Sequence, residues 1–301
     1  MRIFFTITVI SLLLISCGGG SGNAITLKFN LGKGSKLDYT GSVDMNISEN
    51  VMGNNVNVQN KMRMGYLFEV LNDSAGWKTL NSTISRISMD MNANGQSLKF
   101  DTDSSVSDTT GPSGMMMKIF GAMKGGQFSF TMDEKGNVGE VRGMKEMMEH
   151  TLTKINVPNA EMIMQNMGKS FDADNFKQNL EQSFAMYPDK PVKPGDTWTR
   201  TSSLNSNGMP IKMENTYTLN SVSGNIADVK VSSKLSSGTE GSSMGVKELT
   251  GTLTGDTHYD IASGVPLDGS MQMKMNMKVS AQGQEIPVNM VMTMTTLGKK
   301  L

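Results

Sequence analysis

The sequence predicts an α+β fold that is rich in β-structure, in which two related antiparallel β regions form a half-barrel or a sandwich and are joined by a central amphipathic helical segment. Polar and apolar residues alternate through residues 27–142 and again through residues 191–301. Between them, residues 143–190 change to the apolar spacing of helices. Residues 1–16 and 17–26 precede these regions as a leader and a short tether.

The first β region has the pattern of long hairpins. Val43, Met45 and Ile47 alternate with polar residues, and Met62 and Met64 continue the alternation after a turn rich in Gly and Asn. Successive side chains of a strand point to opposite faces of a sheet. This region therefore predicts a sheet with one apolar, Met-containing face and one polar face.

Four segments have helical spacing of apolar residues. They are the run Met115–Met123, the runs that begin at Met144 and at Met162, and the run Phe176–Tyr187. Each of the last three has a single apolar stripe, so each is expected to lie on another element. Asp172 or Asp174 is the predicted cap of the last helix, and Pro188 ends it.

The last hairpin has the most regular alternation in the chain. Its apolar residues occupy every second position on both strands, on either side of a turn at Gln282-Gly283. They are Met271, Met273, Met275, Met277 and Val279 on the first strand, and Ile286, Val288, Met290, Met292 and Met294 on the second. These side chains are expected to share one face of a sheet.

The two β regions begin with similar motifs. Lys33-Gly34 leads to Tyr39 in the first region, and Lys193-Pro194-Gly195 leads to Trp198 in the second. Each region also ends with a strand that runs into a Gly turn, at Phe130–Val138 and Tyr259–Val265. We interpret these motifs as a diverged internal repeat. The alternative is that two sheets with like turn chemistry resemble each other by chance.

The N-terminal residues have the features of an export signal. Arg2 precedes an apolar run from Ile3 to Ile15 that is too short to span a bilayer. The sequence Leu14-Ile15-Ser16-Cys17 resembles the lipobox of bacterial lipoproteins. This resemblance implies cleavage before Cys17, a diacylglycerol on its sulfur, and an acyl chain such as palmitate on its amino group. The alternative is an ordinary secretory signal followed by a chance Cys.

Two features of the following sequence bear on location. Cys17 is the only Cys in the chain, which favours lipidation because a lone thiol has no disulfide partner. Gly18 is not the Asp that marks inner-membrane retention in enteric bacteria, and residues 18–23 form a flexible tether that reaches about 15 Å. We therefore expect a protein anchored in the outer membrane and facing the periplasm. Its expected partners are that membrane and a hydrophobic ligand or another envelope protein.

Composition narrows the class of function. The 28 basic and 28 acidic residues balance, and no basic patch stands out, so a nucleic-acid partner is not expected. No cofactor motif is present, and no cofactor is expected. The chain has 29 Met and few aromatic residues, so methionine replaces other large apolar residues.

The Met stripes have three interpretations. A stripe of period two is most often the buried face of a sheet, which would make the protein a structural or scaffold lipoprotein. Met is also polarizable and adaptable, so a Met-lined face that helices leave uncovered would bind a hydrophobic ligand. The candidate lining residues are Met271, Met273, Met275, Met277, Met290, Met292, Met294, Met62 and Met64. Such a sheet with helices across its mouth resembles the LolA/LolB-type lipoprotein carriers.

A Cu(I) site is the third interpretation, because thioethers select Cu(I). Met271, Met273, Met290 and Met292 are the candidate ligands. Alternate residues on one strand start about 7 Å apart, so a site would need both strands. The two His residues, His150 and His258, lie in different segments, and no metal site is predicted.

Catalytic motifs are weak in this sequence, and an enzyme is not expected. Residues 241–245 match Gly-x-Ser-x-Gly but lie in a Ser/Gly-rich loop with no helix after it. The acidic pairs at Asp101/Asp103 and Asp172/Asp174 lack the spacing of a calcium loop. No catalytic residue is therefore assigned.

Several motifs together resemble a family of Gram-negative envelope lipoproteins of the Bacteroidota type. They are the lipobox at Cys17, the Lys-Gly turn before Tyr39, the turn at residues 133–137, the segment Lys193-Pro194-Gly195-Asp196-Thr197-Trp198, and the two halves around a helical middle. These motifs mark a fold. The resemblance implies no known activity and no functional residues.

Overall fold

A computed structural model describes residues 23–301 of the chain, apart from residues 52–53, 94, 105–110, 156–172, 185, 207–208, 238–245 and 282–283. The strands are β1 (Lys36–Val51), β2 (Asn54–Ser74), β3 (Trp77–Ala93), β4 (Gln96–Asp101), β5 (Gln127–Asp133), β6 (Val138–Arg142), β7 (Thr197–Ser206), β8 (Met209–Ser223), β9 (Ile226–Ser237), β10 (Val246–Asp260), β11 (Pro266–Ala281) and β12 (Gln284–Lys300). The helices of the described chain are α1 (Gly111–Met123), α2 (Met144–Lys154) and α4 (Ala173–Phe184).

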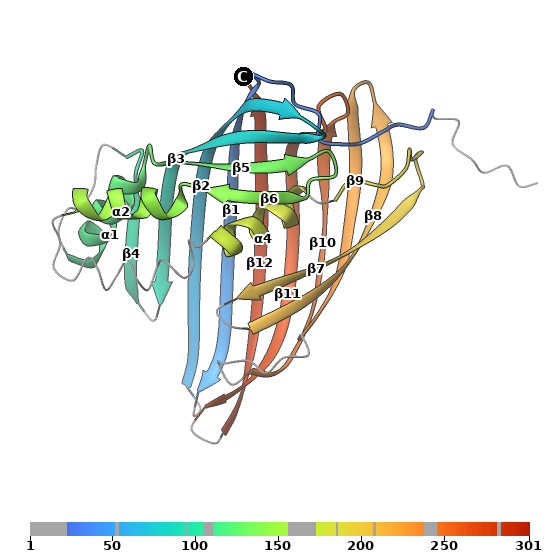
Figure 1. Ribbon diagram of the computed structural model, residues 1–301. Helices are drawn as coiled ribbons and strands as arrows, with labels where there is room; N and C mark the ends of the chain where they lie inside the picture. The colour runs from blue at the N-terminus through green and yellow to red at the C-terminus, as the bar shows by residue number, and fades with distance from the viewer. Residues whose placement is uncertain are drawn as a thin grey trace, which may run out of the picture.

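The twelve strands form one antiparallel sheet with the order β6-β5-β3-β2-β1-β12-β11-β10-β9-β8-β7, and β4 pairs with β3. The first and last strands lie side by side near its middle, where Leu37 pairs with Lys300 and Glu49 pairs with Val288 (Figure 1). The expected α+β class is therefore wrong, because the described chain is mostly strand. The two β regions are the halves of a single sheet, since an alternating pattern identifies strands but not the strands they pair with.

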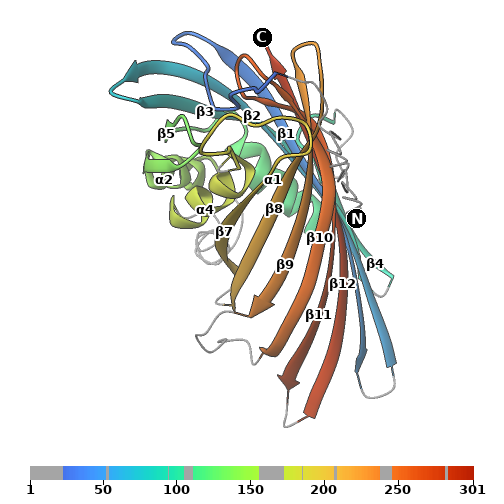
Figure 2. The same cartoon turned by 90° about the vertical axis from the view of Figure 1, so that its right-hand side faces the viewer.

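The sheet is strongly curved, and the three described helices lie on its concave side (Figure 2). The concave face carries the apolar side chains of each strand, and those side chains form the core. The opposite, convex face carries mainly polar and charged residues, such as Asp44, Lys61 and Lys274. The one-sided alternation predicted from the sequence is therefore present in the strands, although helices cover only part of the concave face.

Helix α4 packs on the sheet through residues spaced four apart. Phe176 is half-buried, and Leu180 and Phe184 are buried. The Phe184 ring centroid lies 5.8 Å from that of Tyr39, and the Phe176 ring centroid lies 4.5 Å from that of Phe128. These contacts confirm the apolar stripe predicted for this helix. They place α4 across the concave face, where it packs against both edge strands, β6 and β7.

The other expected helices have different outcomes. Helix α1 confirms the Met115–Met123 prediction and begins four residues earlier, and α2 confirms the run that begins at Met144. In α2 the buried residues include Met144 and Met147, in agreement with the predicted stripe. The run that begins at Met162 lies outside the described residues.

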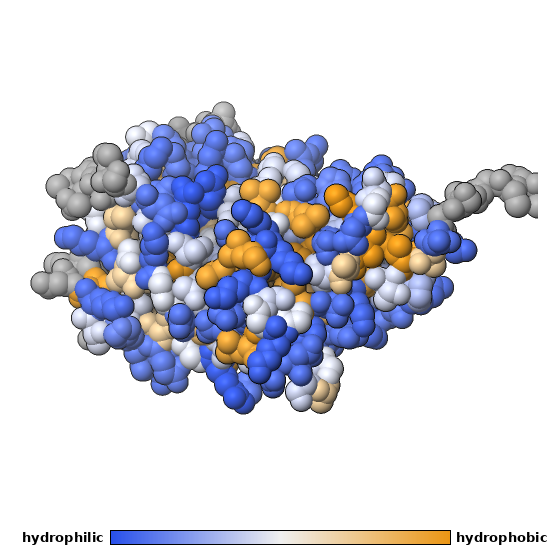
Figure 3. Space-filling view, turned by 90° about the horizontal axis from the view of Figure 1, so that it is seen from above, coloured by the Kyte–Doolittle hydropathy of each residue, from blue (hydrophilic) through white to orange (hydrophobic). Residues whose placement is uncertain are grey.

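A segment that precedes β1, residues 25–31, crosses one end of the curved sheet, and we call it the strap. Leu27, Phe29 and Leu31 in the strap have at most 1% of their surface exposed. The strap donates backbone hydrogen bonds to the two Gly turns, from Phe29 N to Glu134 O (2.9 Å) and from Asn30 N to Ser263 O (2.7 Å). Seen from this end, hydrophilic residues make up most of the surface, with hydrophobic residues in separate groups among them (Figure 3).

The two motifs proposed as a repeat make equivalent hydrogen bonds. Gly34 N donates to Val70 O, and Val70 N donates to Ser35 O. In the second half, Gly195 N donates to Leu219 O, and Leu219 N donates to Asp196 O. The glycines have φ values of 82° and 93°, which favour Gly because other residues rarely adopt them. The likeness of the motifs therefore extends to backbone geometry within the single sheet.

Candidate functional site

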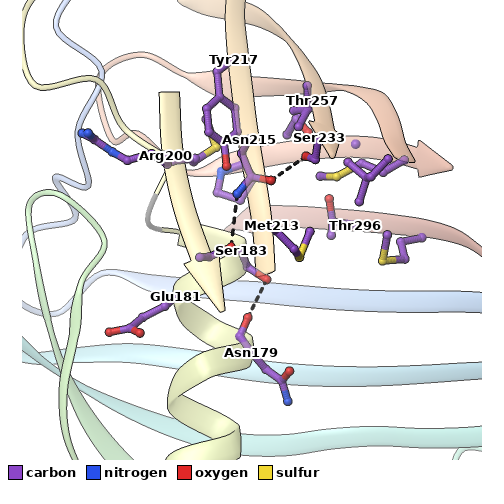
Figure 4. Close-up of a pocket in the computed structure, with 18 of the residues that line it drawn as sticks. Asn179, Glu181, Ser183, Arg200, Met213, Asn215, Tyr217, Ser233, Thr257 and Thr296 are labelled. Atoms are coloured by element: carbon purple, nitrogen blue, oxygen red, sulfur yellow. Dashed lines mark hydrogen bonds between the residues drawn. The ribbon is translucent and has the colours of Figure 1, made fainter. Parts of the chain in front are cut away.

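A cavity of about 880 Å³ lies between α4 and the concave face of the sheet (Figure 4). Strands β1, β12, β11, β10, β9 and β8 contribute its sheet wall. Helix α4 faces this wall with Asn179 and Ser183, and β7 contributes Ser202 at one side. This volume lies within the range of about 300–1,000 Å³ that is usual for ligand sites.

Part of the cavity exists because the sheet wall contains Gly41. In the pairing of β10, β11, β12 and β1, Thr257, Gly269, Thr296 and Gly41 form one row across four strands. All four residues line the cavity. A Cβ placed on Gly41 would have no atom within 4 Å, so the wall is hollow at this point. A strand glycine often marks a place where another group approaches the backbone closely.

The next two rows of the wall are apolar. Val43, Met294 and Met271 follow one another on adjacent strands, and Met273 and Leu253 pair in the row beyond. All five line the cavity. Leu253 and Met273 are buried, whereas the other three are half-buried. The chain therefore provides a flexible, apolar floor beside the hollow row.

A buried polar network interrupts this floor on β8 and β9. Ser233 Oγ donates a hydrogen bond of 2.5 Å to Asn215 Oδ1, and Asn215 Nδ2 donates one of 3.3 Å to Ser202 Oγ (Figure 4). Asn215 and Ser233 are only 7% and 2% exposed, so hydrogen bonding offsets the unfavourable burial of their polar groups. Burial also raises the pKa of the neighbouring Tyr217 hydroxyl to about 12, so this hydroxyl remains protonated and neutral.

The charged residues that line the cavity are balanced and paired. Asp189 accepts hydrogen bonds from Arg200 Nη1 at 2.8 Å and from Lys135 Nζ at 3.0 Å. These two cations hold the pKa of the Asp189 carboxyl well below its usual range. Glu181 Oε1 accepts a hydrogen bond from the backbone N of Val138 in edge strand β6. Two positive and two negative residues therefore cancel in the described lining.

The structure brings some of the predicted Met residues to the cavity and leaves others outside it. Met271, Met273 and Met294 line the cavity. Met275, Met277, Met290 and Met292 lie on the same face at the next positions of β11 and β12, where Met273 pairs with Met292 and Met275 with Met290. Met62 lines a separate groove, and Met64 accepts a hydrogen bond from the Tyr66 hydroxyl.

The polar residues of the site were not predicted, although the sequence contains a signal for them. Asn215 follows Met213 and precedes Tyr217, and Ser233 lies between Val231 and Leu235. Each is a polar residue at an apolar position of an alternating strand. Gly41 and Gly269 give a similar signal, because glycine inside a strand has no side chain to pack.

The weak catalytic and metal motifs do not assemble into a site among the described residues. His258 pairs with Asp268 at 2.7 Å on β10 and β11, whereas His150 lies on α2. Asp101 is bound by Arg86, which lowers the pKa of its carboxyl. In the described part of the chain, no group of three His, Cys, Asp or Glu residues is placed to hold a metal ion. Residues 241–245 and Cys17 lie outside the described residues.

Comparison with known families identifies the chain. A model described as "Family of unknown function (DUF6263)" matches residues 75–266, which is more than half of the chain. The chain belongs to this family. The part that matches DUF6263 runs from the β2–β3 turn to the first residue of β11, so it includes α4 and strands β8, β9 and β10 of the cavity wall. A search of curated protein sequences found no match to this DUF6263 chain.

Solved structures resemble this DUF6263 protein only distantly. A structure titled "Lipid-protein interactions in lipovitellin" has a TM-score of 0.47 at 9% identity, covering 87% of this chain but only 25% of the lipovitellin chain. The translocator domain of autotransporter NalP from Neisseria meningitidis has a TM-score of 0.22 at 7% identity, covering 89% of each chain. A DUF1329 family protein from Desulfovibrio piger has a TM-score of 0.14 at 11% identity, covering 86% of this chain and 84% of its own. These scores support no conclusion about function.

No helix in the described part of the chain has both the length and the apolar character needed to cross a bilayer.

Proposed function

We propose that this DUF6263 protein is a lipid-anchored protein of the bacterial cell envelope that binds a hydrophobic ligand and catalyses no reaction. The observation that carries the proposal is the cavity of about 880 Å³ on the concave face, with its floor of Met and Leu side chains. Burying an apolar ligand there would remove the apolar surfaces of the ligand and of the cavity floor from water, which is favourable by roughly 25 cal/mol per Å² of buried surface. The half-buried Met271 and Met294 suit ligands of varied shape because Met has flexible, polarizable side chains.

The proposed anchor is Cys17. Five residues separate it from Asn23, the first described residue, and the Gly/Ser tether of residues 18–23 spans about 15 Å on average. Ile25 then pairs with Val192 through two backbone hydrogen bonds of 2.8 and 2.9 Å. The cavity would thus be held close to the membrane surface, where the periplasmic face of the outer membrane is the proposed site. Two or three acyl chains on one Cys would make this attachment lasting.

The ligand proposal can be tested with the fluorescence of Trp198. Its ring stacks on that of Tyr217 at a centroid distance of 5.7 Å, and its Nε1 donates to Met186 O at 2.6 Å. Tyr217 and Met186 both line the cavity. Trp77 is the only other Trp and is 41% exposed, so a Trp77→Phe protein has one reporter. Titration of this purified protein with oleate, monooleoylglycerol and octadecene should give saturable changes in emission for at least one of them.

Gly41→Leu provides the matched test of location. The added side chain has room in the hollow because no atom lies within 4 Å of the new Cβ, and Gly41 has no positive φ that would strain a leucine. It should abolish the saturable change, whereas Gly32→Leu, which adds the same side chain at an exposed position outside the cavity, should not. If none of the three probes binds the Trp77→Phe protein, the Met faces are core and the protein is better described as a scaffold. Binding that survives Gly41→Leu would place the ligand elsewhere.

Anchoring is tested separately. Cys17→Ser should move the protein from the membrane fraction of the producing bacterium to the soluble fraction and abolish incorporation of labelled palmitate. Membrane association that persists unchanged in Cys17→Ser would overturn the anchor without affecting the ligand proposal.

A further inference from the structure

The end of the sheet that the strap crosses, which Figure 3 shows from above, carries most of the exposed large apolar side chains of the described chain. Six such side chains are at least 39% exposed, and five of them lie in hairpin tips or near strand ends at this end. They form what we call the strap-end surface: Leu71, Trp77, Ile226, Leu297 and Leu301. The sixth, Val291, lies nearer the middle of β12. Apolar side chains scattered singly need no explanation, so it is their gathering at one end that indicates an interaction surface.

Backbone hydrogen bonds tie the turns of this end into one unit. Trp77 pairs with Asp133 at the start of the β5–β6 turn. The strap donates to that turn and also to the β10–β11 turn. From the β10–β11 turn, Ile261 N donates to Asn225 O at 2.8 Å, directly before Ile226 in the chain. The hairpin tips that carry Trp77 and Ile226 are therefore held in fixed positions on the same end of the molecule, on either side of the strap.

The proposed anchor leads to this end of the sheet. The described chain begins with Asn23 just before the strap (Figure 1). Cys17 lies six positions earlier, and a chain of this length spans at most about 20 Å when fully extended. By comparison, the 17 residues of β12 extend for about 55 Å from the far end of the sheet to this one. With Cys17 in a bilayer, the strap-end surface is therefore the part of the sheet held closest to the lipid.

The chemistry of this end fits a phospholipid surface. A Trp side chain such as the exposed Trp77 has an apolar ring with a polar N–H, and Trp is enriched where membranes meet water. Four exposed lysines of this end have no ion pair among the described residues: Lys33, Lys193, Lys299 and Lys300. In the turns beside them, the carboxylates of Asp133 and Asp196 accept hydrogen bonds from backbone N–H groups. The lysines are thus available to the phosphate groups of lipids, which an ammonium group binds as a point charge.

We propose that the strap-end surface docks on the phospholipid bilayer that holds the anchor, with Leu71, Trp77 and Ile226 among the lipid headgroups. The inference rests on the proposed function, since Cys17 supplies the membrane, and it adds the part of the protein that touches that membrane. Lys135 in the β5–β6 turn and Pro266 at the start of β11 belong to the same end and also line the cavity. Docking in this orientation places the cavity beside the bilayer, so that an apolar ligand moves between them with little exposure to water.

The test uses the anchored protein in phosphatidylcholine vesicles whose acyl chains carry bromine, which quenches Trp emission. The emission of Trp77 is the difference between the wild type and Trp77→Phe, which retains only Trp198, so lipid inside the cavity does not affect it. This emission should be about twofold lower in brominated than in plain vesicles, because a Trp side chain in the interface lies against the acyl chains. Leu71→Asn and Ile226→Asn should each reduce the quenching by about half, since each replaces an apolar contact with a polar one. Val291→Asn, a similarly exposed position outside the surface, is the matched control and should leave it unchanged.

The outcomes separate this inference from the proposed function. Equal Trp77 emission in brominated and plain vesicles would overturn the docking surface, because the tether would then hold the protein clear of the bilayer. Quenching that is the same in Leu71→Asn, Ile226→Asn and Val291→Asn would also overturn it, because the tether alone would then bring Trp77 near the lipid. Failure of the proposed function is measured by other signals, namely labelled palmitate on Cys17 for the anchor and the Trp198 titration for the ligand.

Discussion

Two glycines with the same backbone conformation allow the contribution of the strap to be measured. Gly34 has φ of 82° and Gly264 has φ of 71°. An added methyl group at residue 34 would meet nothing within 4 Å, whereas at residue 264 it would lie 1.9 Å from the carbonyl oxygen of Lys28 in the strap. Gly34→Ala therefore reports the conformational effect alone, and Gly264→Ala reports that effect together with displacement of the strap.

The magnitudes follow from these geometries. A left-handed conformation disfavours Ala by about 1–2 kcal/mol, so Gly34→Ala should reduce the free energy of unfolding by about that amount. To restore van der Waals contact at residue 264, the strap would move by about 1.5 Å. This shift would break the two hydrogen bonds that Asn30 makes to Ser263 O and Ala262 O. At about 1 kcal/mol for each hydrogen bond, together with the conformational effect, the total loss for Gly264→Ala should be about 3–4 kcal/mol.

The assay is equilibrium unfolding of both variants and the wild type in urea, followed by far-UV circular dichroism. Equal m-values would show that the variants unfold from equally compact states. Gly264→Ala should be less stable than Gly34→Ala by about 2 kcal/mol, which is the strap contribution. A difference smaller than about 1 kcal/mol would refute the reasoning, because the strap would then be able to leave its position without loss of its hydrogen bonds.

Three further predictions concern packing and charge. Phe184→Ala should reduce the free energy of unfolding in urea by about 3–5 kcal/mol, because the ring is 1% exposed and fixes α4 on the sheet. The Asp268 carboxylate raises the pKa of His258, so the pair should add stability below the unfolded-state pKa of about 6.5 and lose it as the pH rises through the higher folded-state value. At about pH 6, His258→Gln should therefore reduce the free energy of unfolding, by well under 1 kcal/mol because the site is exposed. At about pH 9 the same substitution should leave stability unchanged. Arg86 binds the Asp101 carboxylate through two nitrogens, so Asp101→Asn should reduce the free energy of unfolding by about 1 kcal/mol at about pH 7. The pKa of this carboxyl is lowered in the folded state, and the loss should shrink as the pH falls through that pKa and the wild-type carboxyl becomes protonated.

Each of these predictions has an outcome that contradicts it. A loss below about 1.5 kcal/mol in Phe184→Ala would mean that α4 is not held by its aromatic face. A constant effect of His258→Gln across the pH range would exclude its ion pair as the cause. An Asp101→Asn variant that is equally destabilised at low and neutral pH would show that the loss is one of packing and not of charge.

The sequence predicts the individual strands better than it predicts which strands pair with each other. The alternating Met residues of β11 and β12 identify both strands and place their side chains on one face, because the period of a strand is visible in the sequence. The pairing of Tyr39 on β1 with Gly298 on β12 cannot be predicted from the sequence, because an alternating pattern does not specify which distant strand lies beside a given strand. The expectation of two joined regions failed for this reason.

The site was predicted in its apolar part and missed in its polar part. The alternating stripe predicts Met271, Met273 and Met294 as lining residues, and all three line the cavity. Asn215 and Ser233 were missed because the pairing of β8 with β9, which brings their side chains together, is not visible in the sequence.

The central pairing of β1 with β12 also determines when this protein can finish folding. The residues that pair there are separated by more than two hundred positions, as in Ser42 with Thr295. The middle of the sheet therefore cannot form until nearly the whole chain is available, and such distant contacts slow folding because the connecting chain must be ordered first. Before that moment β1 and β11 each present a long unpaired edge to other chains. A chain that ends before β12 should consequently aggregate, and a segment that imitates β12 should be an effective inhibitor of folding.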